Sequence, residues 1–267
     1  MTLRPVRDTR LWVEDTGGDL PPVVFSHGVL WNTSLFAPQV SALRGRYRCI
    51  SYEHRGQGRS DDAAGKEVSI ETVYADAVAL IESMALGPVH FVGLSMGGFV
   101  GMRIAARRPD LLRSLTLMDT ACTAENPVKV PQYWGLNFMA QLFGVESVVD
   151  SAMKSLFGRT VLRDPARADD VVRWRATLAG NRRTVVCAVR GVMARKSVTD
   201  EMPRITAPTL IMVGEEDVAT PPARSEQLHR LITGSTLVRI PRAGHSAPVE
   251  EPEAVTRALS DFLALQG

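Results

Sequence analysis

The sequence predicts an α/β fold in which a mostly parallel β-sheet is flanked by helices. Two observations carry this prediction. Short apolar runs alternate with segments of helical periodicity along most of the chain, as they do in successive βα units. Several of these runs are apolar on both faces, which is typical of parallel strands buried between two layers of helices. The length of 267 residues suits one large domain, or a core domain with an insertion.

Six strands are predicted from the apolar runs. In chain order they fall within residues 21–28, 47–56, 89–95, 112–120, 208–217 and 235–245. Helices are predicted between and after them, within residues 69–86, 96–108, 221–232 and 251–266. Ser69 with Thr72, and Pro222, are residue types that helix starts prefer, so they mark the beginnings of two of these helices.

Residues 122–204 interrupt this alternation. The stretches "VESVVDSAMKSLF" and "DDVVRWRATLAG" have helical patterns, and strand-like runs are few. Two prolines in "MPRITAPTL" frame the return to a strand. We therefore expect a helical insertion at 122–204 within a core domain formed by residues 1–121 and 205–267.

Charge and cysteine content exclude several classes of protein. The chain has 31 Lys and Arg against 29 Asp and Glu, a net charge of +2, and no dense basic run, which argues against a nucleic-acid-binding protein. An arginine group in the insertion is predicted to be a solvated helical face. It comprises Arg173, Arg175, Arg182, Arg183, Arg190 and Arg195.

The chain is also expected to be soluble and cytoplasmic, with no membrane partner. Three widely spaced cysteines, at positions 49, 122 and 187, give neither a disulfide framework nor a Cys-X-X-Cys metal site, so a reducing compartment is expected. No apolar stretch approaches the ~18 residues of a membrane span, and the first residues have no apolar signal region.

Ser95 lies in "GLSMGG", directly after a strand run and directly before a predicted helix. A serine at such a sharp strand-to-helix turn needs neighbours without a Cβ, and Gly93, Gly97 and Gly98 provide them. The alternative, a phosphate-binding loop, is disfavoured because the glycine spacing is not Gly-X-Gly-X-X-Gly and no P-loop lysine follows. Ser95 is therefore the candidate nucleophile.

A serine hydroxyl needs a base to remove its proton, and His245 is the best placed of the histidines. It follows the last predicted strand on a loop next to Gly244, where a sheet of this kind exposes functional loops. The others suit different roles: His90 in the core or at a sheet edge, His229 exposed on a helix, and His27 fixing a loop. His54 could line a site, but a structural hydrogen bond is favoured for it.

The acid that orients the histidine is expected at another strand end. Asp217 follows the apolar run "LIMVG" and precedes His245 in the chain. Glu215 and Glu216 compete within the same turn but are expected to be solvated, and Asp119 is the second choice. The resulting order Ser, Asp, His is the order of the α/β-hydrolases.

Two backbone N–H groups are expected to stabilise the negative charge of the tetrahedral intermediate. One belongs to Met96, which follows the nucleophile. The other is assigned to Val29, in the turn that follows the strand run ending at His27 and Gly28.

Five segments carry a resemblance to a known family: "SHGVLWN", "YEHRGQGRSD", "GLSMGG", "LIMVGEED" and "RAGHSAPVEEPE". Together they resemble the α/β-hydrolase superfamily, in particular its 3-oxoadipate enol-lactonase, non-haem haloperoxidase and esterase branch. The resemblance implies an eight-stranded, mostly parallel sheet with a helical cap inserted after the strand that ends near Asp119. It also implies that Ser95, Asp217 and His245 form a catalytic triad. Glu53 departs from the aspartate usual in the family, at a turn that is mainly structural.

These residues predict a serine hydrolase that cleaves a small-molecule ester or lactone through an acyl-enzyme, with no metal and no organic cofactor. Three alternatives stay open: a perhydrolase or haloperoxidase in which hydrogen peroxide replaces water, a hydrolase of C–C bonds, and a catalytically silent ligand-binding protein with the same fold. The sequence indicates no oligomeric state.

Substrate contacts are predicted for two groups of residues. Trp31, like Met96, flanks the proposed oxyanion loop. Aromatic and methionine side chains of the insertion are candidates to face an apolar acyl or alcohol group, although packing between cap and sheet explains them equally well. These are Tyr133, Trp134, Phe138, Met139 and Phe143.

Overall fold

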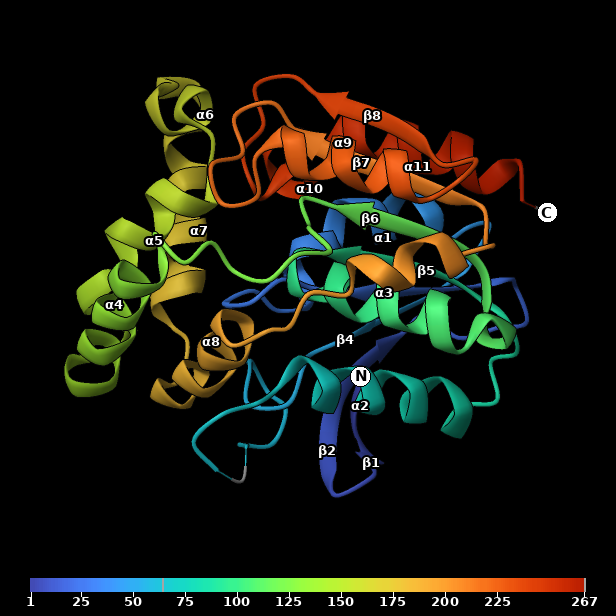
Figure 1. The fold of residues 1–267 in the computed structure, drawn as a ribbon, viewed down its shortest axis with the longest axis horizontal. Coiled ribbons are helices and arrows are strands. Elements are labelled where there is room, and N and C mark those ends of the chain that lie inside the picture. The colour runs from blue at the N-terminus through green and yellow to red at the C-terminus, as the bar shows by residue number, and fades with distance from the viewer. Residues whose placement is uncertain (64, 267) are drawn as a thin grey trace.

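The computed structural model describes residues 1–63 and 65–266, so only residue 64 and the last residue of the predicted core domain lie outside the description. Within these residues, eight strands form one sheet in the order β1-β2-β4-β3-β5-β6-β7-β8 (Figure 1). They are β1 (Thr2–Val6), β2 (Thr9–Asp15), β3 (Pro22–Ser26), β4 (Arg48–Tyr52), β5 (Val89–Leu94), β6 (Leu112–Met118), β7 (Thr209–Gly214) and β8 (Thr236–Ile240). Strands β3 to β8 pair in parallel, whereas β1 pairs with β2, and β2 with β4, in antiparallel fashion. The predicted eight-stranded, mostly parallel sheet is confirmed.

The helices alternate with the strands at both ends of the chain and gather in the middle of it. They are α1 (Ala37–Leu43), α2 (Ile70–Ser83), α3 (Met96–Arg107), α4 (Val130–Phe143), α5 (Val149–Leu156), α6 (Arg159–Arg163), α7 (Ala168–Ala179), α8 (Val186–Met193), α9 (Pro222–Leu231), α10 (Ala247–Glu250) and α11 (Pro252–Ala264). As predicted, Ser69 caps α2 by accepting a hydrogen bond from Thr72 N, and Pro222 is the first residue of α9. No helix within the described ranges is both long and apolar enough to cross a bilayer.

The hairpin of β1 and β2 was not among the strands predicted from the apolar runs. Its strands form one edge of the sheet, and only Val6, Leu11 and Val13 among their residues are buried. A half-exposed edge hairpin carries a weak apolar pattern, which explains why these two strands were not recognised.

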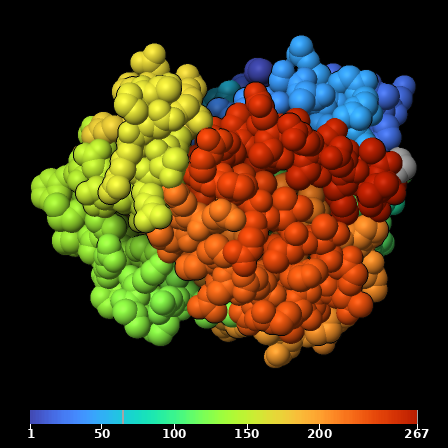
Figure 2. Space-filling view, turned by 90° about the horizontal axis from the view of Figure 1, so that it is seen from above, coloured from blue at the N-terminus to red at the C-terminus, as the bar shows by residue number. Residues whose placement is uncertain are grey.

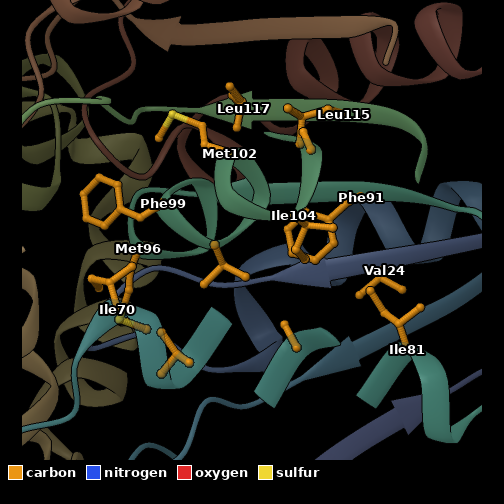
Figure 3. Close-up of a cluster of buried hydrophobic side chains, with 14 of the residues drawn as sticks. Val24, Ile70, Ile81, Phe91, Met96, Phe99, Met102, Ile104, Leu115 and Leu117 are labelled. Atoms are coloured by element: carbon orange, nitrogen blue, oxygen red, sulfur yellow. The ribbon is translucent and has the colours of Figure 1, made fainter. Parts of the chain in front are cut away.

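Side chains that alternate along the strands pack on opposite faces of the sheet. Figure 3 shows one face, where Phe91 and Leu115 of two neighbouring strands pack with Ile81 of α2 and Ile104 of α3. Val24 of β3 joins this cluster. Strand alternation therefore places α2 and α3 against the same apolar surface.

The other face of the sheet carries α1 and α11. Phe25 and Val92, one position along from the residues of the first face, belong to a second buried cluster. Leu43 of α1 and Leu259 and Leu263 of α11 complete it. Because both faces are covered by helices, the central strands are apolar on both sides, as the sequence indicated.

Helices α4 to α8 all lie between β6 and β7 in the chain. They stand together at one end of the molecule, beyond the carboxyl ends of the parallel strands (Figure 1). The space-filling view shows this green-to-yellow segment packed beside the orange-to-red C-terminal part of the chain (Figure 2). The loops that follow β3, β5, β7 and β8 therefore face these helices, and the candidate site lies between them.

Candidate active site

Ser95 sits at the turn between β5 and α3 with φ 51° and ψ −110°, a conformation that costs free energy in a non-glycine residue. The turn is held by hydrogen bonds from Ser95 N to Met118 O, at 2.9 Å, and from Thr120 Oγ1 to Ser95 O, also at 2.9 Å. A Cβ on Gly97 would overlap the carbonyl oxygen of Ser26, and one on Gly93 would overlap that of Gly97. The glycines are thus required for the close approach of β3, β5 and α3.

We expect Gly97→Ala to destabilise the protein by about 1–3 kcal/mol, because its Cβ meets backbone that cannot move aside. The matched control is Gly135→Ala in α4, where an added Cβ has open space and alanine should stabilise the helix by roughly 0.5–1 kcal/mol. Thermal unfolding of both variants checks this. A Gly97→Ala protein as stable as wild type would mean that the strand and helix do not approach so closely.

His245, in the loop between β8 and α10, pairs with Asp217, in the loop after β7. The distance from His245 Nδ1 to Asp217 Oδ2 is 2.8 Å, and both side chains are buried. Asp217 Oδ1 accepts hydrogen bonds from the N–H groups of Ala219 and Thr220, and Thr220 Oγ1 donates to Oδ2. A carboxylate that accepts the Nδ1 proton leaves Nε2 of the imidazole free to take a proton from another group.

The surroundings of His245 favour its charged form. Burial of the ring lowers its pKa, but the negative charge and hydrogen bond of Asp217, with smaller contributions from other acidic groups nearby, outweigh that effect, so the pKa of His245 is raised. Such a histidine accepts a proton more readily than one in water.

Asp119, the second-choice acid, has no hydrogen bond to His245 among the described residues but accepts one from Gly214 N at 2.8 Å. Complete burial, followed by the charge of Asp217, raises the pKa of Asp119 well above its usual range. Its neutral form is favoured, and a neutral acid cannot stabilise an imidazolium. The competing glutamates also point elsewhere: Glu216 accepts hydrogen bonds from Thr160 N and Oγ1, and Glu215 is exposed.

Glu250 supports the His245 loop and was not singled out in the sequence. Its Oε2 accepts hydrogen bonds from Gly158 N at 2.7 Å and Gly244 N at 3.0 Å, and its Oε1 accepts one from Ser246 N at 2.9 Å. It thereby holds the backbone on both sides of His245. Burial raises the pKa of Glu250 to about 7, despite these three donors. Three glutamates occur in "PVEEPE", and nothing in that pattern marks this one.

The loop after β3 lies against Ser95. A Cβ on Gly28 would be 2.8 Å from Leu94 Cδ2 and 3.3 Å from Ser95 Cβ, so the backbone that leads to Val29 passes beside the serine. Among the described residues, neither Val29 N–H nor Met96 N–H has a hydrogen-bond acceptor. Two unpaired N–H groups near one serine can bind a developing oxyanion.

A buried polar network fixes this loop. His54 Nε2 donates to His27 O at 3.1 Å and lies 3.2 Å from Ser26 Oγ, which in turn contacts Tyr52 Oη at 2.8 Å. His27 Nδ1 donates to Gly28 O at 2.7 Å. Burial lowers the pKa of His27 to about 4 and that of His54 well below its usual range, so both rings are neutral. They act as structural hydrogen-bonding groups, the role predicted for them.

The two remaining histidines lie where the sequence placed them. His90 is buried in β5, where its Nδ1 is 2.8 Å from Ser114 Oγ, and His229 is exposed on α9 beside Ser235. Glu53, the departure from the family pattern, is buried and accepts hydrogen bonds from Arg59 and Thr33, which fits a structural turn.

Ser95 and His245 open into one cavity of about 160 Å³ beneath the helices of residues 122–204. Its wall is mainly apolar and includes Val29, Leu136 and Val148. No hydrogen bond joins Ser95 Oγ to His245 among the described residues, and such contacts are often loose until substrate binds. No group of side chains that could hold a metal ion occurs in the described ranges.

The predicted substrate contacts divide into two groups. Tyr133 lines the cavity. Trp31, contrary to the prediction, is buried and is not among the wall residues, and its Nε1 donates to Ser246 Oγ at 3.1 Å. The side chain of Met96 packs in the core, so only its N–H is available (Figure 3). The structure corrects the prediction for four residues, which are exposed on α4 and do not line the cavity. These are Trp134, Phe138, Met139 and Phe143.

The correction has a physical reason. Helix α4 is apolar over most of its circumference, so the sequence could not tell which face turns inward.

Arg195 is a second correction. It was expected on a solvated face, but it is buried, pairs with Glu125 at 2.7 Å and lies over the ring of Phe99.

Comparisons with known proteins agree with the fold. A family model described as the alpha/beta hydrolase fold matches residues 21–252. The chain is 31% identical to the putative non-heme bromoperoxidase BpoC of Mycobacterium tuberculosis (strain ATCC 25618 / H37Rv), over 94% of this chain and 96% of that protein. It is 28% identical to the putative carbamate hydrolase RutD of Pseudomonas syringae pv. syringae (strain B728a), over 93% and 95%.

Solved structures are similar over nearly the whole chain. The enol-lactonase from Burkholderia xenovorans LB400 superposes with a TM-score of 0.91 at 26% identity, covering 98% of this chain and 100% of that one. A thermophilic esterase from Thermogutta terrifontis, solved with malate bound, gives a TM-score of 0.89 at 29% identity, covering 97% and 94%.

Proposed function

The chain belongs to the alpha/beta hydrolase fold family, and on that premise we propose that it is a serine hydrolase that cleaves a carboxylic ester or lactone through an acyl-enzyme. One observation carries the proposal. His245 and Ser95, which sits in a strained turn, line the same cavity, and His245 Nδ1 is 2.8 Å from Asp217 Oδ2. Activity on esters or lactones also fits two structural relatives, an esterase and an enol-lactonase.

In the proposed mechanism, Ser95 Oγ attacks the substrate carbonyl carbon and His245 Nε2 takes the hydroxyl proton. Asp217 holds the imidazole and stabilises the imidazolium that forms. The N–H groups of Val29 and Met96 donate to the oxyanion. His245 then gives its proton to the leaving alkoxide, which departs as the alcohol. In the second half, His245 removes a proton from water, the hydroxide attacks the acyl carbonyl, and Ser95 leaves reprotonated with release of the acid.

The cavity suits a small molecule with an apolar acyl or alcohol group, since its wall is largely aliphatic. In this proposal residues 122–204 form a cap over a core of 1–121 and 205–267, and Tyr133 contacts the substrate from the cap. No step requires a metal or an organic cofactor. A cytoplasmic location is part of the same proposal, because three free, buried thiols suit a reducing compartment.

The test is a panel of p-nitrophenyl esters, aliphatic lactones and an aryl carbamate, the last included because a relative is named a putative carbamate hydrolase. We expect measurable kcat/KM on esters or lactones, unchanged by EDTA. A second arm adds hydrogen peroxide, because a relative is named a putative bromoperoxidase and peroxide can replace water at the same acyl-enzyme to give a peracid. Turnover of the carbamate alone, or loss of activity with EDTA that zinc restores, would contradict the proposal.

The raised pKa of His245 predicts the acid limb of the pH profile. The imidazole must be neutral to accept the serine proton, so kcat/KM for a non-ionising ester should fall as pH drops. The midpoint should lie above the ordinary histidine value of about 6.5. The measurement is kcat/KM across about pH 5 to 9.

Glu250 also titrates in this range, because its pKa is about 7, so Glu250→Gln serves as the control. The kcat/KM of this variant should be lower at every pH, but its fall toward acid pH should remain because His245 is still present. A limb that vanishes in Glu250→Gln, or a wild-type midpoint below about 6.5, would contradict the role given to His245.

A further inference from the structure

Asn137 is an unusual residue in the wall of the cavity. It lies on the inner side of α4, is 4% exposed and lines the same space as Ser95 and His245. Neither its Oδ1 nor its Nδ2 has a hydrogen-bond partner among the described residues. Buried amides nearly always have partners, so a side chain with both atoms free and facing a cavity indicates a ligand.

Three other polar or charged side chains of the wall are engaged within the protein. Thr220 Oγ1 donates to Asp217, and Ser155 Oγ donates to Ser151 O. Arg195 Nη1 donates to Glu125 at 2.7 Å and its Nε donates to Thr123 O at 3.1 Å, so the two charges of that pair offset each other. The amide of Asn137 is therefore a buried polar group left for a bound molecule, and Tyr133 is a second polar residue in the wall.

We propose that Asn137 is a specificity-determining residue, which recognises one uncharged hydrogen-bonding group on an otherwise apolar substrate chain. The group is a hydroxyl, a ketone or an amide. This inference rests on the proposed ester or lactone hydrolysis at Ser95. A carboxamide both donates and accepts, and a charged substrate group would require an opposite charge that the paired Arg195 and Glu125 do not provide.

The preference follows from desolvation. In the free enzyme, both polar atoms of the Asn137 amide are buried, each with less than 1 Å² exposed, and neither has a hydrogen-bond partner among the described residues. A purely apolar chain leaves both atoms unpaired, whereas a chain with a polar group at the right position supplies the missing hydrogen bonds. A site of this kind discriminates against the analogue that lacks the polar group.

The test uses medium-chain p-nitrophenyl esters that carry a hydroxyl or a ketone moved one carbon at a time along the acyl chain, compared with the unsubstituted ester. For wild type, kcat/KM should peak at one position, at least about tenfold above the unsubstituted ester. Asn137→Leu, which conserves volume but removes both polar atoms, should lose this peak and should hydrolyse the unsubstituted ester at least as well as wild type.

Three controls separate the possible outcomes. Leu136→Ala changes apolar volume beside Asn137 without altering hydrogen bonding, so it should shift all esters together and keep the peak. The melting temperature of Asn137→Leu should not fall, because no internal hydrogen bond is lost. If that variant does not fold, Asn137→Ala removes the same two atoms and carries the comparison.

A polar-group preference that survives in Asn137→Leu, or wild type without any positional preference, would overturn the inference. Either result is distinct from failure of the proposed function, in which wild type would hydrolyse none of the esters. A large fall in melting temperature for both Asn137 variants, with the peak retained in either, would likewise assign Asn137 a structural role.

Discussion

Ser95→Ala is expected to lower kcat by about 10³-fold or more while leaving the melting temperature close to that of wild type. The loss is large because the members of a triad act as a unit, and removing the nucleophile leaves only binding and the oxyanion donors. The fold should persist because Ser95 Oγ makes no hydrogen bond among the described residues. Alanine also has the same Cβ at φ 51°, so the backbone strain is unchanged.

Ser155→Ala is the matched control for Ser95→Ala. Ser155 lines the same cavity, and its hydroxyl donates only to the carbonyl of Ser151 in its own helix. Its replacement should leave kcat within a few-fold of wild type. A Ser95→Ala enzyme that keeps half of the wild-type turnover would remove Ser95 from the mechanism.

Asp217→Asn is expected to reduce kcat by an amount that can reach roughly 10⁴-fold, with the fold intact. The amide can still accept hydrogen bonds from Ala219 N and Thr220 N through its oxygen. Its NH₂ group would then face His245 Nδ1 and donate to it, which puts the remaining imidazole proton on Nε2, where the base must be free. Steady-state kinetics with one ester, together with thermal unfolding, measures both effects.

Asp119→Asn is the control for Asp217→Asn. Burial and the nearby Asp217 charge already favour the neutral form of Asp119, and asparagine resembles that form. The amide oxygen can still accept the hydrogen bond from Gly214 N, so the effect on kcat should be small. If Asp119→Asn were inactive and Asp217→Asn nearly normal, the acid would have to be assigned to the end of β6.

The sheet and the predicted reacting residues could be found in the sequence because their signals are local. Ser95, Asp217 and His245 each follow an apolar run and stand beside or near glycine. Parallel pairing then brings the carboxyl ends of these strands to one edge, although the residues are far apart in the chain. The eight-stranded count came from the family resemblance, because the edge hairpin of β1 and β2 is too polar to recognise alone.

Contacts across the cavity could not be predicted in the same way. The inward face of α4 is set by how the helices of 122–204 pack on the core, and its apolar residues surround the helix. Glu250 and Arg195 owe their burial to backbone and side chains distant in sequence. One sequence signal was available: the asparagine at position 137 lies inside an otherwise apolar helix.

If Ser95 carries the acyl group, active-site labelling should modify it and no other residue. The folded protein is treated with a fluorophosphonate, its intact mass is measured, and the modified peptide is mapped. We expect one adduct, located on Ser95, that blocks ester hydrolysis in proportion to its formation and is absent from Ser95→Ala. An adduct on another residue, or an active preparation that hydrolyses esters at full rate without any adduct, would contradict it.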